Sequence, residues 1–186
     1  IHQEMPKGDP AGRMHGFQLW ANLPASLKMT SPRYQAIRSG EVPDVTEDDG
    51  PRIRVICGHG FGVQGPVVGI AADPSYLDIS VPAGRRKTLP VETSRHAFAY
   101  VFGGNGTFAG ASDPRAPMTE FVDARGAALT SEPVAVAREA DNRSLVLFDR
   151  GDEITVQAGD EGIRFLLVSG QPLREPVAWH GPIVMN

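Results

Sequence analysis

The sequence of 186 residues has a single cysteine, Cys57, which excludes a disulfide bond within the chain and favours a reducing compartment. It has no apolar run long enough to cross a membrane and no segment typical of a secretory signal peptide. It also lacks an excess of positive charge, with 18 Lys and Arg against 22 Asp and Glu, whereas nucleic-acid binding needs clustered basic residues. We therefore expect a monomeric cytoplasmic protein, or a nuclear one in a eukaryote, that binds neither membranes nor nucleic acid directly.

Glycine and proline are abundant instead, at 21 and 16 residues, which favours short strands joined by turns over long helices. Alternation supports this interpretation, because Ile53, Val55 and Cys57 would share one face of a strand. The predicted strands are Gly16–Leu23, Arg52–Cys57, Tyr76–Val81, Ala97–Phe102, Ser144–Phe148, Glu153–Gln157 and Ile163–Ser169. This pattern predicts an all-β fold, an antiparallel sandwich or barrel.

The segments between these strands contain one candidate helix, one candidate linker and one candidate hairpin turn. Ser31–Ser39 is the best helical stretch, with Pro32 at a plausible first helical position. Glu41–Pro51 is acidic, flanked by prolines and nearly devoid of large apolar residues, which is typical of a linker. The "GGNG" at Gly103–Gly106 predicts a hairpin turn, because Asn-Gly suits backbone positions of positive φ.

Two motif-like stretches have ordinary structural explanations. The "GFGVQG" at Gly60–Gly65 fits a dinucleotide-binding pattern, but that pattern must open a helix, whereas Pro66 and an apolar stretch follow here. We interpret it as a glycine-rich bend and His59 within the same loop as a loop histidine. Cys57 lies on the apolar face of a predicted strand, so we expect a buried, inert thiol, and no G-x-S-x-G nucleophile elbow is present.

Two other stretches resemble the conserved motifs of cupins, small barrels of the double-stranded β-helix or jelly-roll type. "GDEITVQAG" at Gly151–Gly159 resembles the second cupin motif, and "HAFAYVFGGNG" at His96–Gly106 resembles the strand and turn of the first. The resemblance implies that the metal-ligand positions fall near Pro90, Glu92, Ala97 and Gly162. A transition-metal site needs several converging imidazoles or carboxylates, so we expect this cupin to be metal-free. His96 alone does not rebuild a site.

Three further stretches indicate which cupins these are. They are "IHQEMP" (Ile1–Pro6), "GFQLWANLP" (Gly16–Pro24) and "GQPLREPVAWHGPIVMN" (Gly170–Asn186). Together they resemble the pirin family, bicupins whose first barrel binds one non-haem iron and whose second usually does not. The resemblance covers essentially the whole chain and implies a first barrel that is incomplete here. Residues 1–40 would be its C-terminal part, 41–51 a linker, and 52–186 the second, metal-free cupin domain.

The resemblance also implies where iron binds. In pirins three His and one Glu hold the iron, and His2-Gln3-Glu4 resembles the strand that supplies one His and the Glu. On a strand these two side chains would point to the same face. We therefore expect His2 and Glu4 to be ligands of one Fe²⁺, with Glu4 also the catalytic base. No His-x-His occurs in the sequence, so the other two His ligands are expected upstream of Ile1.

Two functions are compatible with this ligand set. Some pirins resemble quercetin 2,3-dioxygenases, which implies an oxidoreductase acting on a flavonol or similar phenolic substrate with O₂. The alternative is a redox-sensing regulator, in which the state of the iron alters a surface that binds a protein partner without turnover. Both kinds of pirin share the same ligands, so the sequence leaves both functions open, as well as a third possibility that this piece of chain has neither activity by itself.

Overall fold

The computed structural model describes residues 8–48, 50–111, 121–122, 128–129, 139–181 and 183–186. Within these residues the fold is all-β, as predicted, and the only helical elements are the short 3₁₀ turns η1 (Ala25–Leu27) and η2 (Ser39–Glu41). The strands are β1 (Asp44–Thr46), β2 (Arg52–Cys57), β3 (His59–Gly60), β4 (Val63–Gln64), β5 (Ser75–Val81), β6 (Arg86–Pro90), β7 (His96–Phe108), β8 (Phe121–Val122), β9 (Ala128–Leu129), β10 (Leu145–Leu147), β11 (Glu153–Gly170), β12 (Ala178–His180) and β13 (Ile183–Met185). None of the helices described is long and apolar enough to span a membrane.

The chain forms two compact units. The larger unit, Ile37–Gln171, contains β1 to β11, and the smaller one combines Ile1–Ala36 with Pro172–Asn186. In the smaller unit the two ends of the chain are joined by side-chain hydrogen bonds, such as that from Lys28 Nζ to the carbonyl oxygen of Val184 at 3.1 Å. Pro172–Asn186 thus packs with the N-terminal segment, whereas the predicted second domain included it. The assignment of residues 1–40 and 52–186 to two cupin domains stays a prediction.

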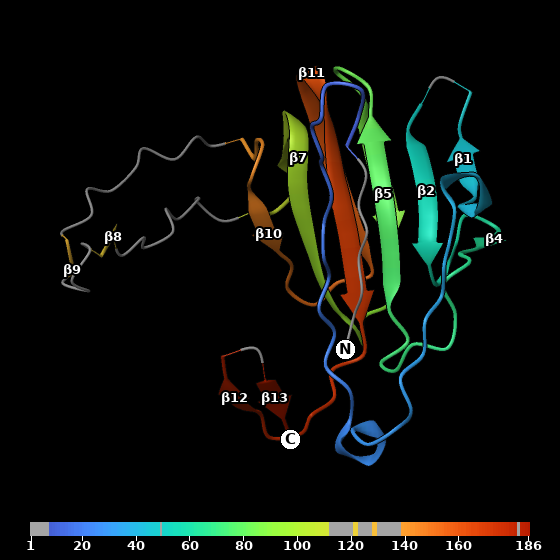
Figure 1. Ribbon diagram of the computed structural model, residues 1–186. Helices are drawn as coiled ribbons and strands as arrows, with labels where there is room; N and C mark the ends of the chain where they lie inside the picture. The colour runs from blue at the N-terminus through green and yellow to red at the C-terminus, as the bar shows by residue number, and fades with distance from the viewer. Residues whose placement is uncertain (1–7, 49, 112–120, 123–127, 130–138, 182) are drawn as a thin grey trace. The chain divides into compact units, whose positions relative to one another are not determined.

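An antiparallel sheet makes up most of the larger unit. Its strand order is β1-β2-β5-β11-β7-β10 (Figure 1). In addition, β6 pairs with β11. The long strand β11 is central, because its first part pairs with β6 and its second part with β5, while β7 runs beside nearly all of it. Among the strands described, β1 and β10 form open edges, so this is a bent jelly-roll sheet and not a closed barrel.

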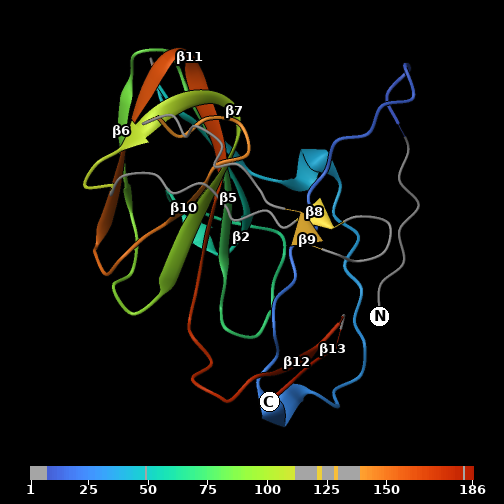
Figure 2. The ribbon, with the colours of Figure 1, turned by 90° about the vertical axis from the view of Figure 1, so that its left-hand side faces the viewer.

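The sheet folds back over its own core. Phe108 on β7 pairs in register with Val156 on β11. Phe165 lies nine residues further along β11, on the order of 30 Å away if the strand were straight. The rings of Phe108 and Phe165 are nevertheless 5.4 Å apart in an edge-to-face arrangement. This contact requires β7 and β11 to bend sharply between these points, and Figure 2 shows both strands curving over towards β6.

The bend coincides with a change in which residues face the core. On β11 the even positions from Ile154 to Ala158 belong to the core cluster before the bend, and the odd positions from Ile163 to Leu167 after it. The register of β7 against β11 shifts at the same place, between Ala158 and Ile163. An extra residue in one strand produces such a switch, because side chains alternate with a period of two.

Two glycines make the bend possible. Gly104 and Gly162 both have positive φ, +62° and +77°, and a Cβ on Gly104 would lie only 2.0 Å from the carbonyl oxygen of Gly162. Gly103–Gly106 therefore lies inside β7 at a bulge, and the prediction of a hairpin turn there is wrong. For the same reason Glu153–Gln157 and Ile163–Ser169, predicted as two strands, form one continuous strand.

Apolar side chains from five strands fill the space that the bent sheet encloses. Phe165 and Ile79 are fully buried at its centre, and complete burial of a side chain of this size contributes about 1.5 to 3 kcal/mol. The core cluster consists of Ile53, Val55, Leu77, Ile79, Val81, Leu89, Ala99, Val101, Phe108, Ile154, Val156, Ala158, Ile163, Phe165 and Leu167. Arg52–Cys57 and Tyr76–Val81 match β2 and β5 to within one residue, so those two predictions are confirmed.

Three predictions about the N-terminal third are wrong. Gly16–Leu23 forms no strand, and within it Phe17, Leu19 and Trp20 are all exposed. Ser31–Ser39 is not helical, because its few apolar side chains form no stripe that could pack, and Tyr34 remains 79% exposed. The expected linker Glu41–Pro51 contains β1, which pairs with β2 and places Asp44 beside Arg52.

We expect Gly104→Ala to destabilise the protein by about 3 to 5 kcal/mol, because the new methyl group would collide with the backbone of Gly162 as well as occupy an unfavourable φ. Gly84→Ala is the matched control, since Gly84 has φ +66° but open space around its Cβ position, and it should cost only about 1 to 2 kcal/mol. Urea denaturation measures both, and equal losses would contradict the close approach of β7 and β11.

A second prediction concerns acid stability. The hydrogen bond from Arg52 holds the pKa of Asp44 below its ordinary value of 3.8, although burial opposes this effect. A carboxyl group with a lowered pKa stabilises the folded state above its ordinary pKa, and the stabilisation is lost as pH falls through the folded pKa. Asp44→Asn should therefore lose less stability than the parent when pH is lowered from 5 through about 4 towards 2 in thermal melts. If the stability of both proteins depends on pH in the same way, the ion pair between Asp44 and Arg52 contributes nothing to the stability of the folded state.

Candidate functional site

The predicted iron ligands His2 and Glu4 lie outside the described residues. The four other histidines are exposed and spread over both units: His15 and His180 in the smaller one, His59 and His96 in the larger. Within the part of the chain that the structure describes, no three His, Cys, Asp or Glu side chains are grouped so that they could hold a metal ion. The predicted iron site thus depends on the segment around His2 and Glu4.

Of the metal-ligand positions expected in the second cupin, Gly162 lies apart from the others. Ala97, at the beginning of β7, pairs with Ser169 near the end of β11, whereas Gly162 lies at the bend, next to the pairing of Ile163 with Gly104. Ser169 and Gly162 are seven residues apart, on the order of 20 Å along the strand. Residues at Gly162 and Ala97 could not share one small ion. That this cupin is metal-free stays a prediction.

Gly162 is also unsuited to a histidine on steric grounds. Its φ of +77° belongs to the region that side-chain-bearing residues rarely adopt, and a Cβ there would lie 2.9 Å from the carbonyl oxygen of Val81. The residue that the resemblance placed at a ligand position is therefore one that the bend of β11 requires to be glycine.

Two of the other expected ligand positions, Pro90 and Glu92, border a polar pocket that also includes Ser169, near the C-terminal end of β11. This pocket has a volume of about 360 Å³ and is lined by Gly58, His59, Asp73, Ser75, Pro90, Val91, Glu92, Arg95 and Ser169. Its walls come from the ends of β2, β5 and β11 and from the connection between β6 and β7. A pocket of this size is large enough for a small molecule.

Arg95 is the charged centre of this pocket. Its side chain is only 10% exposed, and Nη2 lies 2.6 Å from Asp73 Oδ2 and 3.1 Å from Glu92 Oε1. Nη1 donates to the carbonyl oxygen of Asp73, so the guanidinium joins the loop before β5 to the connection before β7. Burial favours a lower pKa for Arg95, but the hydrogen bonds and charges of Glu92 and Asp73 outweigh burial and raise the pKa above its ordinary value.

Cys57, the only cysteine, ends β2 in a buried position. Burial raises the pKa of its thiol, and the neighbouring charge of Asp73 acts in the same direction. A thiol with a raised pKa is a poor nucleophile at neutral pH. The expectation of a buried thiol on an apolar strand face is thus confirmed, and "GFGVQG" forms the small β3–β4 hairpin with no helix after it, as predicted.

Sequence reasoning missed two ionic groups. The first is the Arg95 group, whose residues come from loops and offered only the short Glu92-to-Arg95 spacing as a signal. The second is a set of ion pairs on the outer face of the sheet, Asp44 with Arg52 and Asp78 with Arg164. Here a signal existed, because Arg164 interrupts the apolar stretch of β11 and Asp78 interrupts that of β5.

The bent antiparallel sheet and its central pair of long strands define a cupin. The family model for the pirin C-terminal cupin domain matches residues 76–186. The chain therefore belongs to the pirin family.

Individual relatives agree with this assignment. A pirin-like protein of Caulobacter vibrioides is 38% identical over 188 residues, covering all of this chain and 57% of the relative, and human pirin is 32% identical with 55% of its length covered. The crystal structure of a quercetin 2,3-dioxygenase from Acinetobacter baumannii is also similar, with a TM-score of 0.69 and 26% identity over 90% of this chain and 49% of that one. The chain spans about half the length of these relatives.

We expect Arg95→Met to lower the free energy of unfolding by about 1 to 2 kcal/mol, because it keeps the apolar stem but removes hydrogen bonds between two loops. Arg86→Met is the control, since Arg86 lies exposed on neighbouring β6. The loss should shrink at high salt, which screens the exposed carboxylates of Asp73 and Glu92. If both variants unfold at the same urea concentration, Arg95 does not hold the loops together.

Proposed function

We propose that this protein is part of a pirin-type non-haem iron dioxygenase that opens the ring of a flavonol or related phenolic substrate with O₂. Membership of the pirin family, together with structural similarity to a quercetin 2,3-dioxygenase over 90% of the chain, is the observation that carries the proposal. The same similarity supports a small-molecule substrate and not a macromolecular one. A cytoplasmic monomer without membrane or nucleic-acid partners is part of the proposal.

The proposed iron ligands are His2 and Glu4. One imidazole and one carboxylate are donors that ferrous iron accepts readily, and sites of this class retain open positions for a substrate and oxygen. Two donors are too few for a stable site, so two further histidines would come from sequence outside these 186 residues. The donor chemistry fits Fe²⁺, and the four described histidines lie scattered and exposed, which favours the N-terminal segment over any of them.

Glu4 would have a second role as the base. A flavonol is activated for reaction with oxygen when its hydroxyl proton is removed, and a carboxylate within hydrogen-bond reach can accept that proton. When bound, iron supplies a site at which the deprotonated phenol and O₂ come together. Glu4 would then hold the proton while the ring is opened, and His2 would be a ligand of the iron.

In the iron-loaded protein that includes the additional ligands, His2→Ala and Glu4→Ala should each remove most of the bound iron and the ring-opening activity. The 186-residue chain alone should bind iron weakly, because His2 and Glu4 supply only two of the donors that a stable site needs. Metal analysis and loss of flavonol absorbance measure the two effects.

The matched controls are His59→Ala and His96→Ala, which should leave iron content and turnover nearly unchanged because both side chains lie exposed in the larger unit. If iron survives the loss of His2, or disappears on the loss of His96, the site does not lie in the first cupin and the proposal is wrong. Full iron binding without any turnover would support the redox-sensing regulator instead of the enzyme.

A further inference from the structure

Two arginines flank a serine on the outer face of the sheet. Arg52 on β2 and Arg164 on β11 both pair in register with Ser80 on β5, and Arg164 pairs on its other side with Gly103 of β7. Residues in register lie side by side on one face of a sheet, with neighbouring strands about 4.8 Å apart. Across the strands, the order in this row is thus Arg52, Ser80, Arg164 and Gly103, with each arginine beside a small residue.

The small residues leave a hollow between the arginines. A pocket of about 370 Å³ lies here, bordered by the bend of β7 and β11 and by the end of β5. It is lined by Gly50, Arg52, Ser80, Val81, Pro82, Gly103, Gly104, Glu161, Gly162, Ile163 and Arg164. We refer to it below as the arginine pocket. All of its residues belong to the larger unit, and none is a predicted metal ligand of the first cupin.

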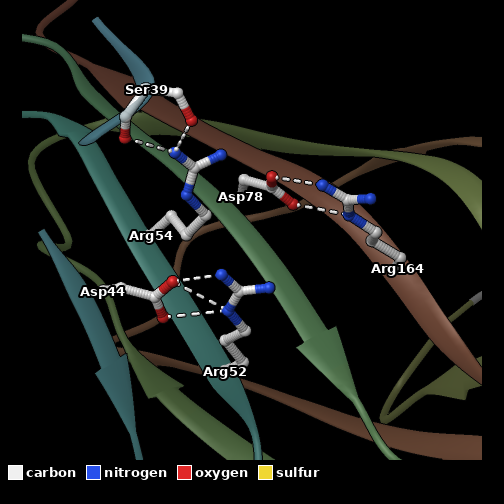
Figure 3. A network of polar contacts seen from close by, with 6 residues as sticks. All are labelled: Ser39, Asp44, Arg52, Arg54, Asp78 and Arg164. Atoms are coloured by element: carbon white, nitrogen blue, oxygen red, sulfur yellow. Dashed lines mark hydrogen bonds and ion pairs between the residues drawn. The ribbon is translucent and has the colours of Figure 1, made fainter. Parts of the chain in front are cut away.

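Carboxylates fix the direction of both guanidinium groups. Arg52 donates from Nε to Asp44 Oδ2 at 2.8 Å and also from Nη2, and Arg164 donates from Nε and Nη2 to Asp78 at 3.0 and 2.7 Å (Figure 3). Asp78 is 9% exposed, so the second pair is partly buried. Each ion pair uses Nε and Nη2, and Nη1 takes part in neither.

The charges of this network do not balance. Arg54 lies between the two carboxylates on the same face and donates to the carbonyl and hydroxyl oxygens of Ser39, at 3.0 Å each (Figure 3). Three guanidinium groups therefore accompany two carboxylates, Asp44 and Asp78. The hydrogen bond to Asp78 raises the pKa of Arg164 in spite of burial, while the charge of Arg52 acts to lower it, which is the electrostatic sign of two cations held near each other.

We propose that the arginine pocket binds the oxyanion group, a phosphate or a carboxylate, of a small organic molecule. Arg52, Ser80 and Arg164 all line the pocket, and phosphates and carboxylates both accept hydrogen bonds from guanidinium and hydroxyl groups without needing a metal. The ion pairs pre-orient the donors, so little side-chain entropy is lost on binding. The anion would offset the repulsion between Arg52 and Arg164.

The volume of the pocket limits the ligand to a small molecule. Glu161, exposed at the pocket's border, is the one carboxylate among the lining residues and opposes an anion. The ligand is therefore expected to place its charge between Arg52 and Arg164, with its uncharged part towards the glycines of the bend. This site is independent of the iron site proposed above, and its test requires no iron.

Titration calorimetry on the full 186-residue chain tests the proposal, with phenyl phosphate and benzoate as separate probes at constant ionic strength. We expect saturable one-to-one binding of at least one probe, and the ratio of the two affinities shows whether phosphate or carboxylate is the preferred group. Arg52→Gln should weaken binding at least tenfold. Arg52 is 59% exposed, so this variant is expected to fold, whereas removal of Arg164 would leave the partly buried Asp78 without its partner.

Two further variants sharpen the test. Arg54→Gln, one row away on the same face, removes an equal charge outside the pocket and should change the affinity less than threefold. Gly103→Val should abolish binding by filling the hollow, because a Cβ there would meet Arg164 Cβ at an ordinary 3.6 Å and leave the strand intact. Circular dichroism confirms folding of each variant. Absence of binding to both probes, or equal binding by the parent and Arg52→Gln, would overturn the proposal.

Discussion

The close approach of β7 and β11 at Gly104 and Gly162 determines the path of the rest of the sheet. The two backbones come so near each other there that a Cβ on Gly104 would lie 2.0 Å from the carbonyl oxygen of Gly162. The bend brings Phe108 against Phe165 and encloses the core, and at the bend the positions of β11 in the core cluster change from even to odd. The same glycines border the arginine pocket, so the feature that closes the core on one face opens a hollow on the other.

The sequence predicted the strands that alternate regularly and missed the features that depend on distant contacts. β2 and β5 were predictable because one face of each is continuously apolar. The bulge was not, since Gly103–Gly106 has the composition of a hairpin turn and only its pairing with β11 makes it part of a strand. β1 was missed for a related reason: its three residues gain stability from pairing with β2 and from Asp44 with Arg52, not from their own propensities.

The candidate sites divide in the same way. Family resemblance identified His2 and Glu4, whose roles are proposals, and it placed Glu92 and Gly162 at former ligand positions of a single site. Strand register separates them, because Gly162 belongs to the bend and Glu92 to the pocket at the far end of β11. Arg95, Arg52 and Arg164 carried no motif, and each binds a carboxylate from another strand or loop: Asp73, Asp44 and Asp78, respectively.

Arginine places a fixed positive charge in each of the two pockets of the larger unit. A guanidinium remains charged at every physiological pH and offers several donors in a plane, but it needs a carboxylate to hold its direction.

Both pockets supply such carboxylates, but they differ in how many guanidinium donors are left for a ligand. Arg95 forms ion pairs with both Asp73 and Glu92 and is nearly buried, so its role is to hold two loops together. Arg52 and Arg164 each face one carboxylate and are about half exposed, which leaves donors for a ligand. The bend of the sheet, and not the end where the cupin motif would place a metal, is therefore where this domain has the means to bind an anion.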